Sequence, residues 1–327
     1  MKQFFTKHYL LWAIPLCLGL FLAGVLLGSS YLSPAQFITG DGQLHPVLIL
    51  RLIRICGAFL IGAALTLSGA TFQAVLRNPL AEPYTLGISG GAAVGAAISF
   101  LAKLHQIHSL MTVVCAFAGA LITLGFVLIL SRGGRKGQES LLLSGIITGT
   151  ICGSILMYIF SVVQLDELSS ITWWLLGDLQ GIDPVTLLPA FLLLVLCFVI
   201  LRFCADGLNM LSLGDSNAWN GGYDPRKLTL ITVICASLLA GMTIAMAGVI
   251  SFCGLIVPHM VRKIRGSDYR KILPALLLTG GSFLMFCDIL SRLLHPAREI
   301  PIGVITSLIG GPLFLWIINR RQRNDVS

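Results

Sequence analysis

The chain has 327 residues, of which 56% are hydrophobic and only 11% are charged, and its mean hydropathy is +0.90. A soluble domain of this length exposes far more charge, so the composition excludes the soluble globular classes and indicates a polytopic membrane protein. Neither a linker nor a soluble insertion interrupts the apolar pattern, and a single transmembrane domain is therefore expected over residues 1–327. The nine cysteines lie in or beside apolar stretches without a CxxC pair, which argues against a disulfide framework or a metal site.

Long uncharged spans recur along the chain and predict transmembrane helices, each of which needs roughly 20 apolar residues. The first span follows Lys2 and Lys7 and is longer than the core of a signal peptide, so it is interpreted as a retained helix. Span 228–261 is too long for one helix and short for two, and Gly248, Gly254 and Pro258 interrupt it. The spans in chain order are 9–32, 55–76, 83–102, 109–131, 140–165, 184–201, 228–261, 272–287 and 300–319.

The positions of the 22 lysines and arginines help to decide whether span 228–261 holds one helix or two. With two helices the all-α chain crosses the membrane ten times, both termini are cytoplasmic, and 17 of the 22 cations face inward. With one helix the same 22 cations divide 11 to 11, so the usual excess of Lys and Arg on the cytoplasmic side favours ten crossings. This topology accounts for the net charge of +8, and lipid rather than nucleic acid is the expected partner. The five cations left outside are Arg51, Arg54, Lys103, Arg292 and Arg298.

Glycines recur at four-residue spacing in two of the predicted helices. Small residues at this spacing let two helix backbones approach closely. The ladders therefore predict either helix packing within the chain or a contact with a second subunit that lines or moves the transport pathway. The glycines are Gly87, Gly91 and Gly95 in the third span and Gly145, Gly149 and Gly153 in the fifth.

Two blocks of longer strings carry a more specific signal. The first block comprises Arg51, Arg54, 62–69, Gln73, 77–83 and 86–95. The second comprises Gly248, 251–259, Arg262, Asp288, Arg292, 299–303, Thr306, Gly310 and Pro312. Together they closely resemble the FecCD-type permease family, which imports cobalamin, ferric siderophores and haem, and the resemblance covers essentially the whole chain.

The resemblance implies a permease subunit of an ATP-binding-cassette importer in the cell inner membrane. It would work by alternating access, as a homodimer or with a paralogous permease, together with two cytoplasmic ATPase subunits and a substrate-binding protein. Ferric siderophore is the first expectation for the cargo, because siderophores are the commonest cargo in the family. No Lys follows a Gly in this chain, so the phosphate-binding loop GxxxxGK[ST] is missing. We therefore expect no cofactor on this chain and no enzymatic activity, with ATP used by the partner ATPase.

The inside loop at about 205–227 is the expected coupling element. Asp215 or Ser216 could cap a short helix there, and Gly221 with Gly222 would end it. In the family, similar residues seat in a groove of the ATPase, although Trp219 departs from the family pattern, as do Gly221 and Tyr223. A bulky charged residue in place of Gly214 or Ala218 is expected to uncouple transport from ATP hydrolysis while the chain stays folded and inserted. The coupling residues implied by the resemblance are Leu213, Gly214, Asp215, Ala218 and Gly222.

Arginines on the outer side form the expected docking site for the substrate-binding protein. By resemblance, Arg51, Arg54 and Arg292 match positions that pair with carboxylates on its two lobes. Arg298 lies outside that pattern. Asp288 precedes Arg292 by four residues, so a helix would place the acid where it can hold the guanidinium. Reversing these charges is expected to weaken docking and to leave folding intact, whereas headgroup anchors would give no such effect.

Two other readings concern ionisable residues. An ion-coupled secondary transporter is the alternative class, and it would need an ionisable group near the middle of the membrane. Asp288 is the only acid inside a span and lies near an outer helix end, which makes this alternative weak. His259 is interpreted as a helix-end residue and not as a metal ligand, because its Pro-His pair belongs to the family pattern whatever the cargo.

Overall fold

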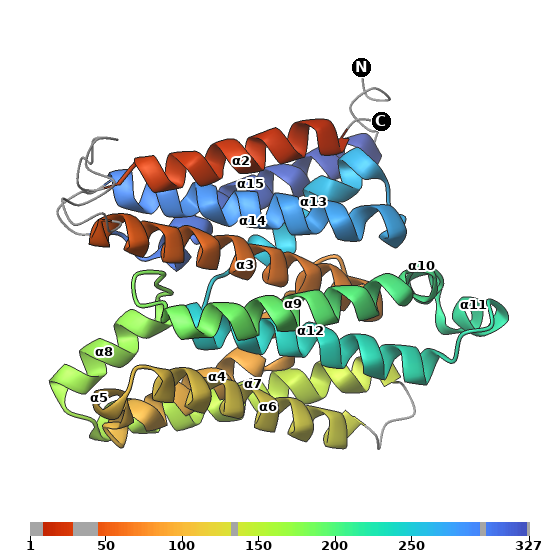
Figure 1. Ribbon diagram of the computed structural model, residues 1–327. Helices are drawn as coiled ribbons and strands as arrows, with labels where there is room; N and C mark the ends of the chain where they lie inside the picture. Colours follow the sequence, from red (N-terminus) through yellow and green to blue (C-terminus); the bar gives the residue numbers. More distant parts are fainter. Residues whose placement is uncertain (1–8, 29–44, 132–136, 295–298, 326–327) are drawn as a thin grey trace.

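The computed structural model describes residues 9–28, 45–131, 137–294 and 299–325. Helices make up nearly all of these ranges, and no strand occurs within them. Figure 1 shows long helices that run side by side along one bundle, with short helices at its two ends. The all-α membrane fold expected from the sequence is therefore confirmed.

The helices that run along the bundle are α2 (Tyr9–Leu26), α3 (Pro46–Val75), α4 (Ile88–Leu101), α6 (Leu110–Ser131), α7 (Gly137–Val162), α9 (Pro184–Phe203), α12 (Pro225–Ala247), α13 (Cys253–Arg265), α14 (Tyr269–Leu294) and α15 (Ile302–Asp325). The short elements are η2 (Pro83–Leu86), α5 (Leu104–Ile107), α8 (Leu165–Leu175), α10 (Ala205–Leu213) and α11 (Asp215–Asn220). Six of the described helices are long and apolar enough to cross a membrane, and three shorter ones are also apolar.

The ambiguous span 228–261 folds as two helices, α12 and α13, separated by residues 248–252. Gly248 and Phe252 adopt left-handed backbone angles with φ of +68° and +67°, which end one helix and begin the next. The Tyr84 hydroxyl donates to the Ile250 carbonyl at 2.6 Å and accepts from the Ile250 amide at 2.9 Å, so both backbone groups of Ile250 within the break are satisfied. The break agrees with the ten-crossing interpretation, although the number of crossings itself stays a prediction.

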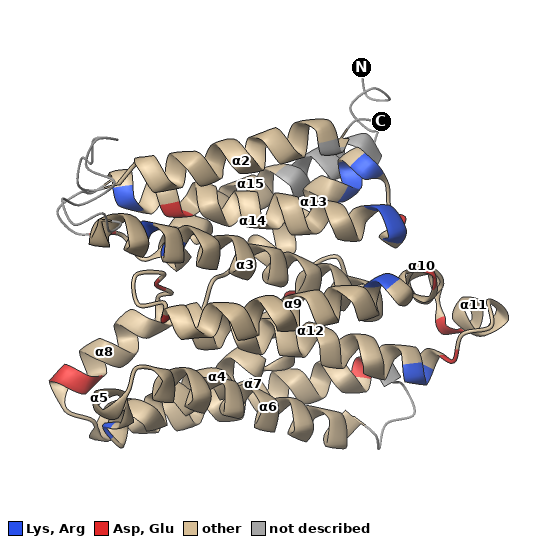
Figure 2. Cartoon of the chain, in the orientation of Figure 1, with Lys and Arg blue, Asp and Glu red and all other residues tan. Residues whose placement is uncertain are grey.

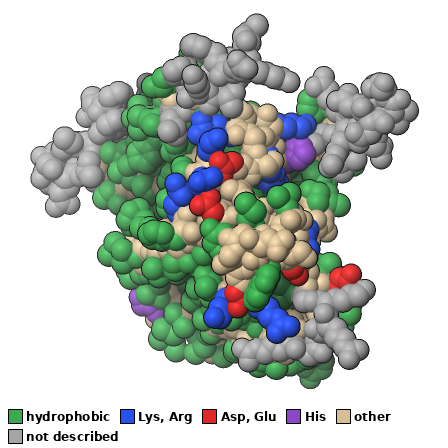
Figure 3. Space-filling view, turned by 90° about the vertical axis from the view of Figure 1, so that its right-hand side faces the viewer, with side chains coloured by type: hydrophobic (Ala, Val, Ile, Leu, Met, Phe, Trp, Pro, Cys, Tyr) green, Lys and Arg blue, Asp and Glu red, His purple; other side chains and the backbone are tan. Residues whose placement is uncertain are grey.

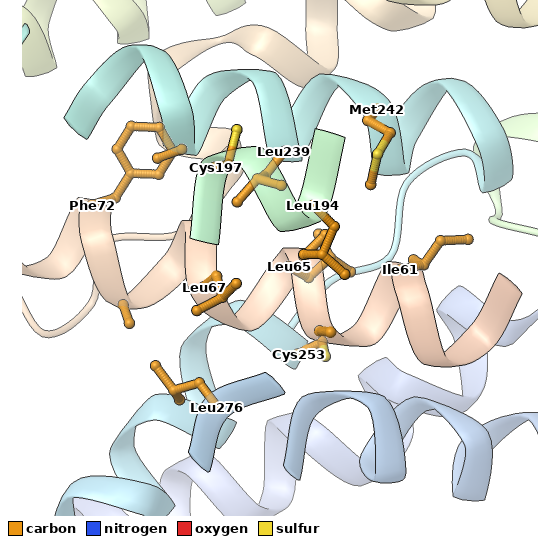
Figure 4. Close-up of a cluster of buried hydrophobic side chains, with 14 of the residues drawn as sticks. Ile61, Leu65, Leu67, Phe72, Leu194, Cys197, Leu239, Met242, Cys253 and Leu276 are labelled. Carbon is orange, nitrogen blue, oxygen red and sulfur yellow. The ribbon is translucent and has the colours of Figure 1, made fainter. Parts of the chain in front are cut away.

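Helix α3 lies at the centre of the bundle and packs against α14, α12, α13, α9 and α10. Figure 4 shows its apolar side chains, among them Leu65 and Phe72, facing residues of the surrounding helices. Two hydroxyls also tie it to its neighbours: Ser68 donates to the Ala236 carbonyl at 2.7 Å, and Thr66 donates to the Leu276 carbonyl at 3.0 Å. Such bonds are favoured within a membrane, where water cannot replace them.

Charged residues gather at the two ends of the bundle, and its middle is almost free of them (Figure 2). Helix α2 begins and α15 ends at the end that also carries α10, α11 and the turn between α13 and α14 (Figure 1). This is the end that the charge distribution assigns to the cytoplasm; the membrane orientation remains a prediction. The opposite end carries α5 and α8, together with the start of α3 and the end of α14, where the predicted docking arginines lie.

Candidate functional site

The predicted coupling loop folds as two short helices, α10 and α11, between α9 and α12. Helix α11 ends at Gly221, as expected, but the prediction that Asp215 or Ser216 caps its start is wrong. Gly214 occupies the cap position with φ of +134°, a conformation that a side chain makes strained, and Asp215 is the first helical residue. A glycine therefore turns the chain between the two helices and sets their relative direction.

Polar contacts fasten this pair of helices to the bundle. Arg77 follows the end of α3, donates from Nε to the Leu211 carbonyl at 2.9 Å, and forms an ion pair with Asp215. On the other side, the Asn209 amide donates to Asp268 at 3.0 Å. No partner for Arg77 could be predicted from the sequence, because Leu211 follows it by 134 positions and no local pattern links the two.

The coupling residues divide into exposed and buried ones. Leu213 and Trp219 are 69% and 66% exposed, which is unusual for apolar side chains at a polar end of the bundle. Gly222 is also exposed, with φ of +83°. Ala218, in contrast, is completely buried against the chain itself. The expectation that a charged residue at position 218 leaves the fold intact is therefore wrong, because the charge would be buried in the packing of α11.

The predicted docking arginines form a buried ionic network at the opposite end. Arg54 contacts Asp288 at 2.6 Å and forms a second ion pair with Glu299, while Arg292 contacts Asp288 at 2.7 Å. Asp288 has no exposed surface, and the side chain of Arg54 is only 11% exposed. The expected Asp288–Arg292 contact within one helix is present. Glu299 was not anticipated as a partner, although an acid directly after a cation-rich segment was a readable signal.

Two of these arginines also cap α2. Arg292 donates to the carbonyls of Gly24 and Leu27 at 2.9 and 3.2 Å, and Arg51 donates to carbonyls 25 and 26 at 3.2 and 3.1 Å. Cations are favourable here because the last carbonyls of a helix lack partners and carry negative partial charge. Arg51 and Arg292 are 6% and 3% exposed. The expectation that charge reversal leaves folding unaffected is wrong for this reason, whereas the docking role stays a prediction. Arg298 lies outside the described residues.

The glycine ladders divide in a similar way. A side chain at Gly91 or Gly95 would collide with α6, and one at Gly87 or Gly145 would collide across the contact between α7 and the segment before α4. Gly149 lies at the edge of that contact, because a Cβ added there would stand 3.4 Å from the Gly87 Cα, an ordinary van der Waals distance. Gly153 has nothing within 4 Å. The first four are therefore packing residues within the chain, and Gly153 faces outward from α7.

No group of three or more His, Cys, Asp or Glu side chains that could hold a metal ion occurs within the described ranges. His259 lies near the end of α13 and lines a pocket at the end of the bundle that carries α10 and α11.

Comparison with known proteins gives three consistent matches. The model of the FecCD transport family matches residues 16–320. The vitamin B12 import system permease protein BtuC of Klebsiella pneumoniae subsp. pneumoniae is 35% identical over 98% of this chain and 96% of its own length. BtuC of Escherichia coli O9:H4 is 36% identical over 94% of this chain and 95% of its own length.

Solved structures share the fold. A transporter assigned to the metal-chelate ABC type, in an inward-facing conformation, superposes with a TM-score of 0.86 at 27% identity, covering 96% of this chain and 99% of that one. PsaBC from Streptococcus pneumoniae in complex with Fab superposes with a TM-score of 0.56 at 16% identity, over 86% of this chain and 94% of that one, and supports the fold alone.

The structure is a helical bundle with apolar spans, polar ends and an exposed pair of short helices, α10 and α11, at one end. These features define the class of membrane permeases that work with separate ATPase and substrate-binding subunits. The chain belongs to the FecCD transport family. It is a multi-pass inner-membrane permease subunit of an ATP-binding-cassette importer, and ATP hydrolysis resides in another polypeptide. This membership removes the ion-coupled secondary transporter as an alternative.

Proposed function

We propose that this permease moves a large metal chelate into the cytoplasm, with cobalamin as the first candidate cargo. The observation that carries the proposal is the similarity to vitamin B12 permeases over 94% to 98% of the chain. The metal-chelate type of the superposed transporter supports the same cargo class. Ferric siderophore, which the sequence favoured, is the second candidate within this class.

Uptake measurements test the cargo. Cells that lack other FecCD permeases would express this chain with its ATPase and binding protein and receive labelled cobalamin, haem or a ferric siderophore. We expect ATP-dependent cobalamin accumulation that continues after an uncoupler has removed the proton gradient. Siderophore uptake without cobalamin uptake would make ferric siderophore the cargo in place of cobalamin. Accumulation of none of the three compounds would contradict the chelate proposal.

We propose that the transport pathway forms between α7 of this chain and a second permease subunit. Hydroxyls of Thr150 and Ser154 and the phenol of Tyr158 are exposed on α7, and Gly153 lies between them. Polar groups on an otherwise apolar helix fit a subunit contact or a polar pathway better than they fit lipid. Crosslinking through a cysteine in place of Ser154 would distinguish a homodimer from a pair with a paralogue, since only a homodimer crosslinks to itself.

The coupling role is proposed for the exposed face of α10 and α11, with Leu213 and Trp219 as the residues that enter the ATPase groove. Two exposed apolar side chains on a rigidly held helix pair suit a protein partner better than water. Leu213, Gly214, Asp215 and Gly222 lie on or beside this face, whereas Ala218 supports it from behind.

The docking role of Arg51, Arg54 and Arg292 is proposed in a modified form. Arg54 pairs with Asp288 and Glu299, Arg292 shares Asp288 with it, and the Arg54 side chain keeps 11% of its surface exposed. A partly exposed guanidinium group at this end steers an acidic partner, and the attraction weakens as salt rises. Arg54→Lys, which keeps the charge, should preserve association with the binding protein at low salt. If Arg54→Lys and Arg54→Gln of equal thermal stability associate at the same rate, the arginine has no docking role.

A further inference from the structure

A pocket of about 450 Å³ opens at the end of the bundle that carries α10 and α11. Its lining contains three cations: Arg77 after α3, and Arg262 and Lys263 in the last turn of α13. Among the lining residues, all of which the structure describes, none is Asp or Glu. The volume lies in the range of small-molecule sites. Figure 3 views this end and shows blue side chains in several places across it, some of them beside red ones, with hydrophobic surface mainly along the left and lower margins.

Arg262 is held in place by a side chain of the core. Gln73 is only 5% exposed, and its amide nitrogen lies 3.3 Å from the carbonyls of both Ala81 and Gly254. Its amide oxygen accepts a hydrogen bond from the Arg262 guanidinium. A buried amide whose donor side is fixed in this way orients the guanidinium before any ligand arrives.

Arg77 connects the pocket to the coupling helices α10 and α11. Arg77 has φ of +47°, a left-handed conformation that is uncommon for a residue other than glycine. Its guanidinium donates to Leu211 and pairs with Asp215. The third cation, Lys263, is exposed and makes no ion pair within the part of the chain that the structure describes.

We propose that this pocket binds a phosphate-bearing anion, either a free phosphate ester or the headgroup of an anionic phospholipid, and that the anion competes with Asp215 for Arg77. Guanidinium groups bind phosphate through two parallel hydrogen bonds, and three cations match a dianion better than a single carboxylate. Two acids at this end of the bundle are already engaged: Asp215 with Arg77, and Asp268 with Asn209, Arg270 and Lys271. Occupancy therefore loosens the hold of α3 on α11. This consequence for coupling rests on the proposed role of α10 and α11, whereas binding does not.

Two simpler explanations of the cations make a different prediction. Cations in the last turn of a helix offset its dipole, and cations gather on the cytoplasmic side of membrane proteins in general. Either effect attracts anions diffusely and predicts no saturable site. It also predicts that any single cation at this end of the bundle contributes equally.

Calorimetric titration of the purified full-length chain with inorganic pyrophosphate distinguishes these cases. The chain would be held in phosphatidylcholine nanodiscs at constant ionic strength, so that the ATPase, which binds phosphates itself, is absent. We expect saturable binding of one pyrophosphate per chain. Lys263→Gln should weaken it at least about tenfold, equivalent to about 1.4 kcal/mol. Lys227→Gln, which removes a cation at the start of α12 outside the pocket, should leave it unchanged.

Further arms identify the source of the phosphate and guard against misfolding. If phosphatidylglycerol in the nanodisc competes with pyrophosphate in the wild-type chain, the occupant is a headgroup; without competition it is a free phosphate, and both results support the site. Lys263 is exposed, so its variant should melt like the wild type and remains informative if Arg262→Gln fails to fold. Absence of saturable binding, an equal loss in Lys227→Gln, or binding of malonate as tight as that of pyrophosphate would each overturn the proposal.

Discussion

At the scale of single residues, the outer ionic network illustrates how a charge can be retained inside a membrane protein. Asp288 is completely buried and forms ion pairs with two guanidinium groups that are themselves largely desolvated. Burying these charges is costly, so the network is not a source of stability relative to an apolar core. Removal of one member is nevertheless expected to be severe, because it leaves its partners buried and uncompensated.

Asp288→Asn should therefore destabilise the chain by about 3–5 kcal/mol, the typical cost of breaking a buried ion pair. Glu299→Gln is the matched control, because Glu299 is 18% exposed and its partner Arg54 keeps Asp288. Thermal unfolding of the purified variants in detergent measures the difference. Equal melting temperatures of the two variants would mean that Asp288 does not hold the network together.

A second residue-scale prediction concerns acid. Partial burial raises the pKa of Asp268, but hydrogen bonds from Asn209 and the Arg270 amide and the charges of Arg270 and Lys271 outweigh it, so the pKa is lowered. A lowered carboxyl pKa stabilises the folded state above the unfolded value of about 4, and this contribution is lost as the pH falls through the folded pKa. Below about pH 4 the melting temperatures of wild type and Asp268→Asn should therefore converge, with the wild type higher at pH 7. A constant difference between them at all pH values would contradict the assignment.

At the scale of elements, α11 carries Ala218, which packs against the rest of the chain, next to Trp219, which is proposed to contact the ATPase. Ala218→Glu should lower the amount of folded protein, because the carboxylate would enter fully buried packing. Trp219→Ala should leave folding unchanged, since the side chain is 66% exposed, and should reduce coupling of transport to ATP hydrolysis. Uptake and ATPase rates of the reconstituted complex, normalised to folded permease, measure this. Normal coupling in Trp219→Ala would exclude Trp219 from the ATPase contact.

The two glycine ladders offer another matched pair. Gly95→Val should prevent the normal approach of α4 to α6, because the new side chain would meet the Cys115 carbonyl and the backbone cannot yield cheaply. Gly153→Val meets nothing within the chain and should fold normally. If α7 lines the pathway, Gly153→Val should reduce transport at wild-type expression. Normal uptake in Gly153→Val would place this face of α7 against lipid.

At the scale of the whole molecule, the orientation in the membrane can be tested directly. A cysteine in place of Ser267, in the turn between α13 and α14, should resist an impermeant thiol reagent applied to intact spheroplasts and react after lysis. A cysteine in place of Ser109, at the opposite end, should react in both conditions. Because the chain has nine cysteines of its own, the unsubstituted protein supplies the background. Labelling of position 267 from outside would show that the orientation is the reverse of the predicted one.

The sequence predicted the helices well, because apolar length and charge placement depend on the solvent and not on neighbouring helices. It even anticipated α11 and the division of span 228–261. It could not predict the burial of Arg51 and Arg292, since the carbonyls that they cap belong to α2, at positions 24–27. Sequence patterns place a residue on a helix, whereas the rotation of that helix against its neighbours decides what the residue contacts. The Arg77–Asp215 pair and the position of Ala218 were missed for the same reason.

The central position of α3 has a consequence for biosynthesis. Its polar side chains find their partners late: Ser68 waits for Ala236, Gln73 for Arg262 and Thr66 for Leu276, separations of 168, 189 and 210 residues. While the ribosome is still making the second half, these distant partners are absent, and only local bonds such as those of Thr66 to carbonyls 62 and 63 can form. The incomplete chain is therefore expected to be less stable in the bilayer than the finished protein, and more susceptible to quality-control proteases. Completion of the last helices, rather than insertion of the first, commits the protein to its native state.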